Sequence, residues 1–310
     1  ENSRQFLLVL GSVVFILLII SLFLKALATY AHVKFVQMCE YSISKRLVEG
    51  YLYQPYSWFL NRNSADLGKT ILSEVQQSIL NGINPLMHLI AKGIIVIALI
   101  ILLILVDPKL AVIVGFALSV SYGIIFYFLR KFLNKIGRER LINNQVRFTA
   151  VNEAFGAAKE IKVGGFEENY INSFSKSAKI FANTQALSQA AAQLPRFFLE
   201  AIAFGGILLI MIYMMSQKGN FNSVVPLLSL YAFAGYRLIP ALQQVYAAFI
   251  QLTFIGPSVD KLNDDLKNLK PVDRTKEHRI LSLNKNINLN NVSFNYPNTE
   301  KVSLKNINLN

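Results

Sequence analysis

Five charged residues lie within or beside long apolar runs of this chain. They are Lys25, Lys92, Arg196, Glu200 and Arg237. Charged side chains inside a membrane face a water-filled cavity or pair with one another, because hydrocarbon solvates them poorly. Since four of the five are cations, the set predicts a binding site for an anionic group. A phosphate or pyrophosphate fits, because arginine holds such groups through two parallel hydrogen bonds.

A purely structural interpretation of the same residues stays open. Glu200 lies one helical turn beyond Arg196, which places both side chains on one helix face. In this interpretation Glu200 pairs with Arg237, while Lys25 and Arg196 extend toward the membrane surface. Arg237 follows Ser223 by roughly 21 Å of helix, which is too deep to reach that surface easily. Even with one pair formed, the set keeps a positive charge.

The elements that carry these residues are apolar runs long enough to cross a bilayer, which takes about 20 residues. The chain has 310 residues, of which 53% are hydrophobic and only 16% charged, and its mean hydropathy is +0.40. Soluble proteins carry about 25% charged residues. Five spans are predicted, at residues 6–24, 86–106, 110–129, 197–215 and 223–252. The predicted fold class is an all-α membrane protein.

The positions of the basic residues predict the orientation. Most of the 31 Lys and Arg residues fall in segments 30–84, 130–196 and 253–310. Loops rich in Lys and Arg stay on the cytoplasmic side, so the chain starts outside and its C-terminal end is cytoplasmic. The net charge of +13 therefore reflects the cytoplasmic face of a membrane protein, and no nucleic-acid partner is predicted.

Cysteine and histidine give no sign of a disulfide or a metal. Cys39 is the only cysteine, so no disulfide can form within the chain. His32, His88 and His278 are far apart in the sequence and lack metal-ligand spacing. Their placement is interpreted as chance, and no metal site is predicted.

Two long internal segments separate the spans, whereas the external connections are very short. Both segments carry apolar residues at helical spacing, so the spans are expected to continue into the cytoplasm as helical hairpins. The hairpins are predicted to turn near Gly68 and near Gly164-Gly165, because glycine tolerates the backbone angles of turns. Such hairpins would meet a cytoplasmic partner.

The character of the chain changes after residue 256. Gly256-Pro257 and a charged stretch predict a linker over residues 257–280, which closes a membrane domain at 1–256. Residues 287–296 then alternate apolar and polar side chains, and residues 302–309 look like a returning strand. Residues 281–310 are therefore predicted to begin a second, soluble domain.

The sequence Val292-Ser293-Phe294-Asn295-Tyr296, following such a helical bundle, resembles the exporter-type ABC transporters. The resemblance implies an exporter transmembrane domain followed by the first strands of a nucleotide-binding domain, in which Tyr296 stacks on the adenine of ATP. The phosphate-binding Walker A loop is not in this chain. ATP with Mg²⁺ would be bound by the intact protein. A further span is expected upstream of Glu1, so the chain is expected to be a fragment.

The resemblance also implies coupling helices that dock on nucleotide-binding domains. They would include Ser73, Glu74 and Gln77 in the first hairpin and Gly164, Gly165, Phe166 and Glu167 in the second. The implied partners are a second transporter half, in a homodimer, and the membrane lipids. The implied location is the inner membrane of a bacterium.

Two short stretches resemble the PglK-type flippases of lipid-linked oligosaccharides. Residues 195–200 match a P-R-x-x-L-E segment and residues 236–240 match a Y-R-L-x-P segment, while Lys25 stands where these relatives carry arginine. The resemblance implies one half of an ATP-driven flippase for an anionic lipid-linked substrate, such as an oligosaccharide or polysaccharide precursor. The alternatives are a peptide, drug or lipid A-type exporter and, in another class, a passive channel or membrane sensor. No catalytic residue is predicted in this chain, since ATP hydrolysis would belong to the domain that follows.

Overall fold

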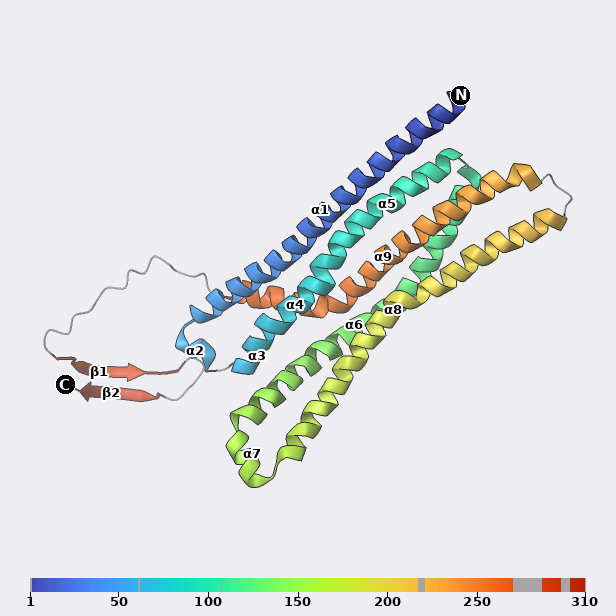
Figure 1. The fold of residues 1–310 in the computed structure, drawn as a ribbon. Coiled ribbons are helices and arrows are strands. Elements are labelled where there is room, and N and C mark those ends of the chain that lie inside the picture. The colour runs from blue at the N-terminus through green and yellow to red at the C-terminus, as the bar shows by residue number, and fades with distance from the viewer. Residues whose placement is uncertain are drawn as a thin grey trace.

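A computed structural model describes residues 2–60, 62–106, 108–216, 221–269, 286–296 and 302–309. The chain forms an elongated helical bundle followed by two strands (Figure 1). Four helices of about fifty residues dominate it: α1 (Asn2–Leu52), α6 (Pro108–Gly156), α8 (Glu167–Ser216) and α9 (Phe221–Asn268). The predicted fold class is confirmed, including the continuation of the spans as long helical hairpins.

The remaining helical run climbs from Ser64 to Val106 in five pieces. They are α3 (Ser64–Lys69), the π-helical turn η1 (Thr70–Glu74), α4 (Val75–Ser78), the π-helical turn η2 (Ile79–Ile83) and α5 (Asn84–Val106). A π turn accommodates an extra residue in a helix and often marks a functional position. This run packs mainly against α9 and α6.

The first hairpin turns earlier in the chain than predicted. The prediction of a turn near Gly68 is wrong, because the chain reverses between Leu52 and Ser64, around the short helix α2 (Tyr56–Phe59). Pro55 precedes α2, and the Asn63 side chain accepts a 2.9 Å hydrogen bond from the Ala65 amide at the start of α3. These two residues fix the turn, whereas Gly68 is tolerated inside α3.

The second hairpin turns where predicted. The short helix α7 (Ala158–Gly164) follows α6, and Gly165 adopts a left-handed backbone with φ of +66° before α8 begins. Glycine adopts this conformation at the end of a helix at little cost, because it has no Cβ atom. The Gly164-Gly165 turn is therefore confirmed.

The last helix extends further than predicted. A linker was expected from residue 257, but α9 continues through Gly256-Pro257 to Asn268. Proline weakens a helix interior, yet Phe254, Ile255 and Leu262 on either side of it are buried. Their packing holds this part of α9 helical, so the first part of the predicted linker belongs to the bundle.

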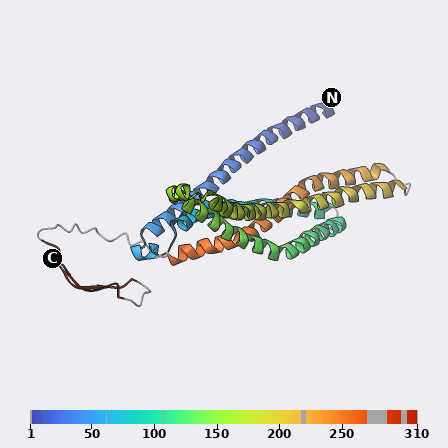
Figure 2. The same cartoon turned by 90° about the horizontal axis from the view of Figure 1, so that it is seen from below.

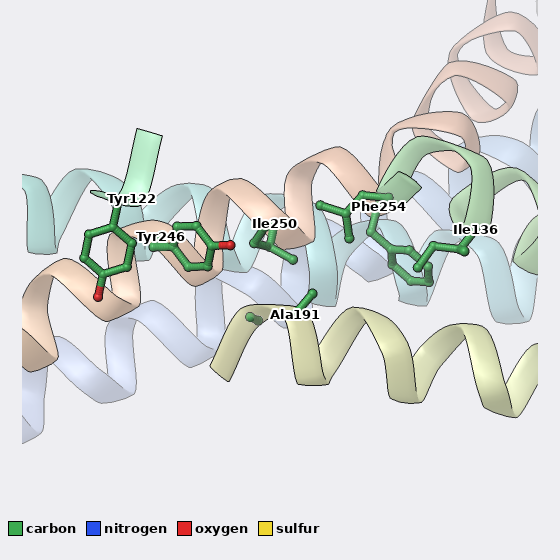
Figure 3. Close-up of a cluster of buried hydrophobic side chains, with 8 residues drawn as sticks. Tyr122, Ile136, Ala191, Tyr246, Ile250 and Phe254 are labelled. Atoms are coloured by element: carbon green, nitrogen blue, oxygen red, sulfur yellow. The ribbon is translucent and has the colours of Figure 1, made fainter. Parts of the chain in front are cut away.

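Helix α6 and helix α9 cross closely at Gly137. A Cβ atom at Gly137 would lie 2.2 Å from the carbonyl oxygen of Phe254. The crossing is flanked by a buried apolar cluster that joins α6, α8 and α9 (Figure 3). Its buried members are Tyr122, Leu133, Ile136, Ala191, Ala192, Tyr246, Ile250 and Phe254. A second apolar cluster, which includes Leu47, Val75 and Leu262, joins α1, the first hairpin and α9.

Helix α1 leaves the bundle toward its N-terminus (Figure 2). All described side chains of residues 5–31 are exposed, and His32 is the first that other parts of the chain shield. Three stretches among the described residues are long and apolar enough to cross a membrane: Gln5–Leu52, Ser64–Leu105 and Leu238–Asn268. They overlap the first, second and last predicted spans. Many side chains of spans 110–129 and 197–215 lie outside the described residues.

The two strands form an antiparallel hairpin, β1 (Leu289–Phe294) with β2 (Leu304–Leu309). The pairing is irregular, because Asn291 and Asn306 adopt positive φ angles of 54° and 52° beside shifts in the register. Asparagine tolerates this conformation better than most residues. A two-stranded hairpin is marginal alone, and nearly all of its side chains are exposed.

Candidate functional site

A buried polar cluster lies below the predicted spans, where η1, α6 and α9 meet. It consists of Glu74, Arg140, Asn144 and Ser258, whose residues are at most 1% exposed. Arg140 Nη2 donates to Glu74 Oε2 over 2.6 Å and also to the Ser258 hydroxyl, while Asn144 Nδ2 donates to Glu74 Oε1 over 2.6 Å. Both carboxylate oxygens of Glu74 are therefore occupied.

Aromatic rings complete the surroundings of this cluster. Arg140 Nε and Nη1 are buried and have no hydrogen-bond partner in the described part of the chain, but the rings of Phe181 and Phe254 lie 5.9 and 6.0 Å from the guanidinium carbon. Arg147 donates to Asn144 and stacks on Phe181 at 4.1 Å. Burial and the neighbouring charge of Arg140 lower the pKa of Arg147. The cluster and its surrounding rings join η1, α6, α8 and α9, and the charges of Glu74 and Arg140 balance each other within it.

A second set of ion pairs links the first hairpin to the lower end of α9. Asp66 Oδ1 lies 2.8 Å from Lys69 Nζ and 3.3 Å from Lys261 Nζ. Burial raises the pKa of Asp66, but the two ammonium groups outweigh it and leave that pKa below its usual value. The first hairpin and α9 are thus held together by charge as well as by apolar packing.

The aromatic turn of the first hairpin joins the same contact. Tyr51 donates a 3.4 Å hydrogen bond to Asp265 on α9, and the Arg62 guanidinium stacks over the Trp58 ring at 4.2 Å. Burial raises the pKa of Asp265, and it raises the pKa of Tyr51, with Asp265 adding to the effect. These groups fix the turn against α9.

The predicted coupling residues of the second hairpin lie at its tip, whereas those of the first hairpin do not. The tip of the second hairpin is formed by Gly164, Gly165 and Phe166. Across it, Glu167 and Lys162 form an ion pair, with Lys162 Nζ 3.0 Å from Glu167 Oε1. Ser73, Glu74 and Gln77 do not lie at the tip of the first hairpin. They lie on the ascending run above α3, where Glu74 is buried in the polar cluster. The tip of the first hairpin is α2 instead.

Two of the predicted substrate residues, Arg196 and Glu200, are in contact. Arg196 and Glu200 pair on α8, with Nε 2.5 Å from Oε1, and both stay partly exposed. The side chain of Arg237 lies outside the described residues, so the predicted alternative of a Glu200–Arg237 pair stays a prediction.

Lys25 and Lys92 have no carboxylate partner within the described part of the chain. Near them lies a feature that the sequence analysis missed. The ring of His32 on α1 meets the ring of His88 on α5 edge to face, with centroids 5.1 Å apart. We refer to Lys25, His32, His88 and Lys92 as the α1–α5 cation group. No spacing rule could have found the histidine pair, because its members come from different helices.

Tyr296 follows strand β1 and packs edge to face on Phe294, with ring centroids 5.0 Å apart. It is 44% exposed. Its ring therefore has an accessible surface on which a flat heterocycle could stack.

The arrangement of long hairpins with tips away from the predicted spans, followed by a strand pair, agrees with a comparison against protein families. The family model of the ABC transporter transmembrane region matches residues 1–236. The chain belongs to this family. It is therefore an integral membrane protein, and its long helices form the transmembrane region of an ABC transporter. The match ends within α9, one residue before Arg237, and the strand hairpin lies beyond it.

Proposed function

We propose that this chain is one half of an ATP-driven ABC exporter that moves an anionic lipid-linked substrate across the membrane. The observation that carries the proposal is the uncompensated charge of Lys25 and Lys92, on two helices, within the described residues. Charge in this position is costly unless a counter-charge is available. A phosphate or pyrophosphate headgroup supplies it, while the lipid chains remain in hydrocarbon.

The remaining predicted substrate residues have a more specific role in this proposal. Arg196 is held by Glu200, so it presents its remaining donors in a fixed orientation. Arg237 is expected to provide a second guanidinium for the headgroup. Residues 195–200 and 236–240, which resemble segments of the PglK-type flippases, support a lipid-linked oligosaccharide or polysaccharide precursor as the substrate.

The energy source is proposed to be ATP with Mg²⁺, bound in a nucleotide-binding domain that the hairpin of β1 and β2 begins. The accessible ring of Tyr296 fits adenine stacking. Two copies of the chain are proposed to pair in the bacterial inner membrane, with the hairpin tips and C-terminal ends on the cytoplasmic side. The tips at α2 and at Gly164–Glu167 would then contact the nucleotide-binding domains.

Reconstitution of the full-length protein into vesicles tests the proposal. ATP-dependent translocation of a pyrophosphate-linked isoprenoid lipid is expected. It should fall by at least about tenfold in the Arg196→Ala/Arg237→Ala double variant, because two charged hydrogen-bonding groups are lost. The matched control is Lys176→Ala, which removes an exposed cation from the second hairpin and should leave translocation unchanged.

Three outcomes would contradict the proposal. Transport without ATP would favour a passive channel. Full translocation by the double variant would exclude the two arginines from headgroup binding. ATP-driven transport of a peptide or drug, with none of the lipid, would favour the other exporter class.

A further inference from the structure

The histidine pair lies where α1 separates from the bundle. Among the described side chains of α1, His32 is the first that other residues shield, and its Nε2 atom is buried without a hydrogen-bond partner among the described residues. The plane of the His88 ring lies at 89° to the plane of the His32 ring. Buried polar nitrogens normally have a partner. The His32 Nε2 atom, placed where α1 separates from the bundle, is therefore available to bind a ligand.

One ammonium group lies beside the pair on α5, and a second lies further along α1. Lys92 lies one turn beyond His88 on α5, close enough for its charge to act on the His88 ring. Lys25 precedes His32 by seven positions on α1, which places it on the same helix face at roughly 10 Å along the axis. None of the four residues contacts a carboxylate among the described side chains.

We propose that His32, His88, Lys92 and Lys25 form a phosphate-binding site whose affinity rises as the two histidines take up protons. The inference rests on the proposed function, because it assigns further residues and a regulation to the proposed headgroup-binding site. The ligand chemistry is a phosphate anion. It is carried by a lipid headgroup or by a soluble phosphate.

The direction of the pH dependence follows from charge. While the two rings are neutral, the lysines alone attract an anion. Each proton that a ring takes up adds a positive charge to the site. Two imidazolium rings with centroids 5.1 Å apart repel each other, and a bound anion relieves this repulsion. Protons and the anion therefore bind together, and each strengthens the binding of the other.

A phosphodiester lipid is the appropriate probe, since its own charge does not change over the pH range of histidine titration. We would measure binding of tail-labelled dioleoyl phosphatidylglycerol to the detergent-purified full-length protein by fluorescence anisotropy. Dimethyl phosphate serves as the soluble phosphodiester, and dioleoyl phosphatidylcholine as the lipid without net charge. Binding would be compared at about pH 7.5 and about pH 5.5, on either side of the histidine pKa.

The unaltered protein is expected to bind phosphatidylglycerol about tenfold more tightly at the lower pH, the change that one unit of pKa shift produces. The His32→Gln/His88→Gln double variant should bind with less than about twofold pH dependence, near the high-pH affinity of the unaltered protein. The matched control, His278→Gln, removes the remaining histidine of the chain and should keep the full pH dependence. Thermal unfolding at the higher pH verifies that each variant is folded.

The outcomes separate this inference from the proposed function. Lipid binding without pH dependence, or pH dependence that survives the double variant, would overturn the inference and leave the proposed lipid export intact. Failure of the lipid to bind at either pH would overturn the inference as well as its lipid ligand. Binding of dimethyl phosphate alone, with the expected pH dependence, would support the site and contradict a lipid as its ligand.

Discussion

Two groups of charged side chains each draw members from the helical run from α3 to α5, Glu74 in one and His88 and Lys92 in the other, and the two groups differ in how charge is balanced. In the buried polar cluster, Glu74 is saturated by Arg140 and Asn144. In the α1–α5 cation group, Lys92 and its neighbours have no acid within the described chain. The charge of Glu74 is balanced within the fold, whereas that of Lys92 has no counter-charge among the described residues and is available, under the proposed function, to a ligand.

The largest test of this contrast removes the acid from the polar cluster. Glu74→Ala leaves Arg140, which is 0% exposed, as a buried cation without its counter-charge. We expect a loss of about 3–5 kcal/mol in the free energy of unfolding. Denaturant unfolding of the full-length protein in detergent measures it.

The control for this variant is Glu153→Ala, which removes an exposed carboxylate from α6, the helix that carries Arg140, and should change stability by less than about 0.5 kcal/mol. A combined Glu74→Met/Arg140→Met variant should recover most of the loss, because neither charge is then left unpaired. Equal stability of the two alanine variants would show that the Glu74–Arg140 pair does not hold the hairpins together.

A smaller effect is expected from the helix crossing that brings the polar cluster together. Gly137→Ala places a methyl group against the Phe254 carbonyl, 2.2 Å away in the present geometry. Helices α6 and α9 must separate, which moves Arg140 from Ser258, and we expect a loss of about 1–3 kcal/mol.

Gly156→Ala provides the matched glycine control for the crossing, since nothing lies within 4 Å of its added Cβ. It should be neutral or stabilising by up to about 1 kcal/mol. Thermal unfolding of both variants distinguishes them, and a Gly137 variant as stable as the Gly156 variant would contradict the close crossing.

Acid should weaken the ion pairs at the base of α9. The pKa of Asp66 is lowered in the folded protein, so its contribution to stability is present above the unfolded value of about 3.9 and is lost as pH falls below it. Asp66→Asn should remove this part of the acid sensitivity. The effect is expected to stay below about 1 kcal/mol because Asp66 is partly exposed.

Melting temperatures between about pH 6 and about pH 3 follow the acid transition through the usual carboxyl range. Asp264→Asn, which changes an exposed carboxylate of α9, should retain the acid sensitivity of the unaltered protein. If Asp66→Asn behaves like Asp264→Asn, Asp66 does not stabilise the contact between α3 and α9.

The smallest effect on stability is expected in the cation group. Lys92→Gln removes a charge that has no partner in the described chain, so unfolding should change by less than about 0.5 kcal/mol. Binding of phosphatidylglycerol should nevertheless weaken at high and low pH. A large loss of stability in this variant would show that Lys92 has a structural role and would remove the contrast with Glu74.

Much of the fold follows from local sequence patterns. Hydropathy predicts the long helices, alternation predicts β1 and β2, and Gly164-Gly165 predicts the second turn. At the first turn, Pro55 and the helix-capping Asn63 give a stronger local signal than Gly68, and the chain reverses beside them. The end of α9 was missed because the buried contacts of Phe254 and Leu262 outweigh the local effect of Pro257.

The candidate site was less accessible to the same reasoning. Depth along the helices identifies Lys25 and Lys92, because charge in an apolar run stands out in any hydropathy analysis. The pairing of Glu74 with Arg140 and of His32 with His88 joins residues of different helices, so it depends on how the helices pack and rotate. A single sequence holds no direct measure of that rotation.

The two π-helical turns determine which partner each face of the α3–α5 run meets. Glu74 and His88 are separated by fourteen positions, and in an uninterrupted α-helix they would point within about 40° of each other. The η2 turn, Ile79–Ile83, lies between them. Its extra residue rotates everything above it by about 100°. The helical run can therefore direct Glu74 toward α6 and His88 toward α1. If η2 relaxed to an ordinary α-helical turn, the angle about the helix axis between the buried polar cluster and the proposed binding site would change.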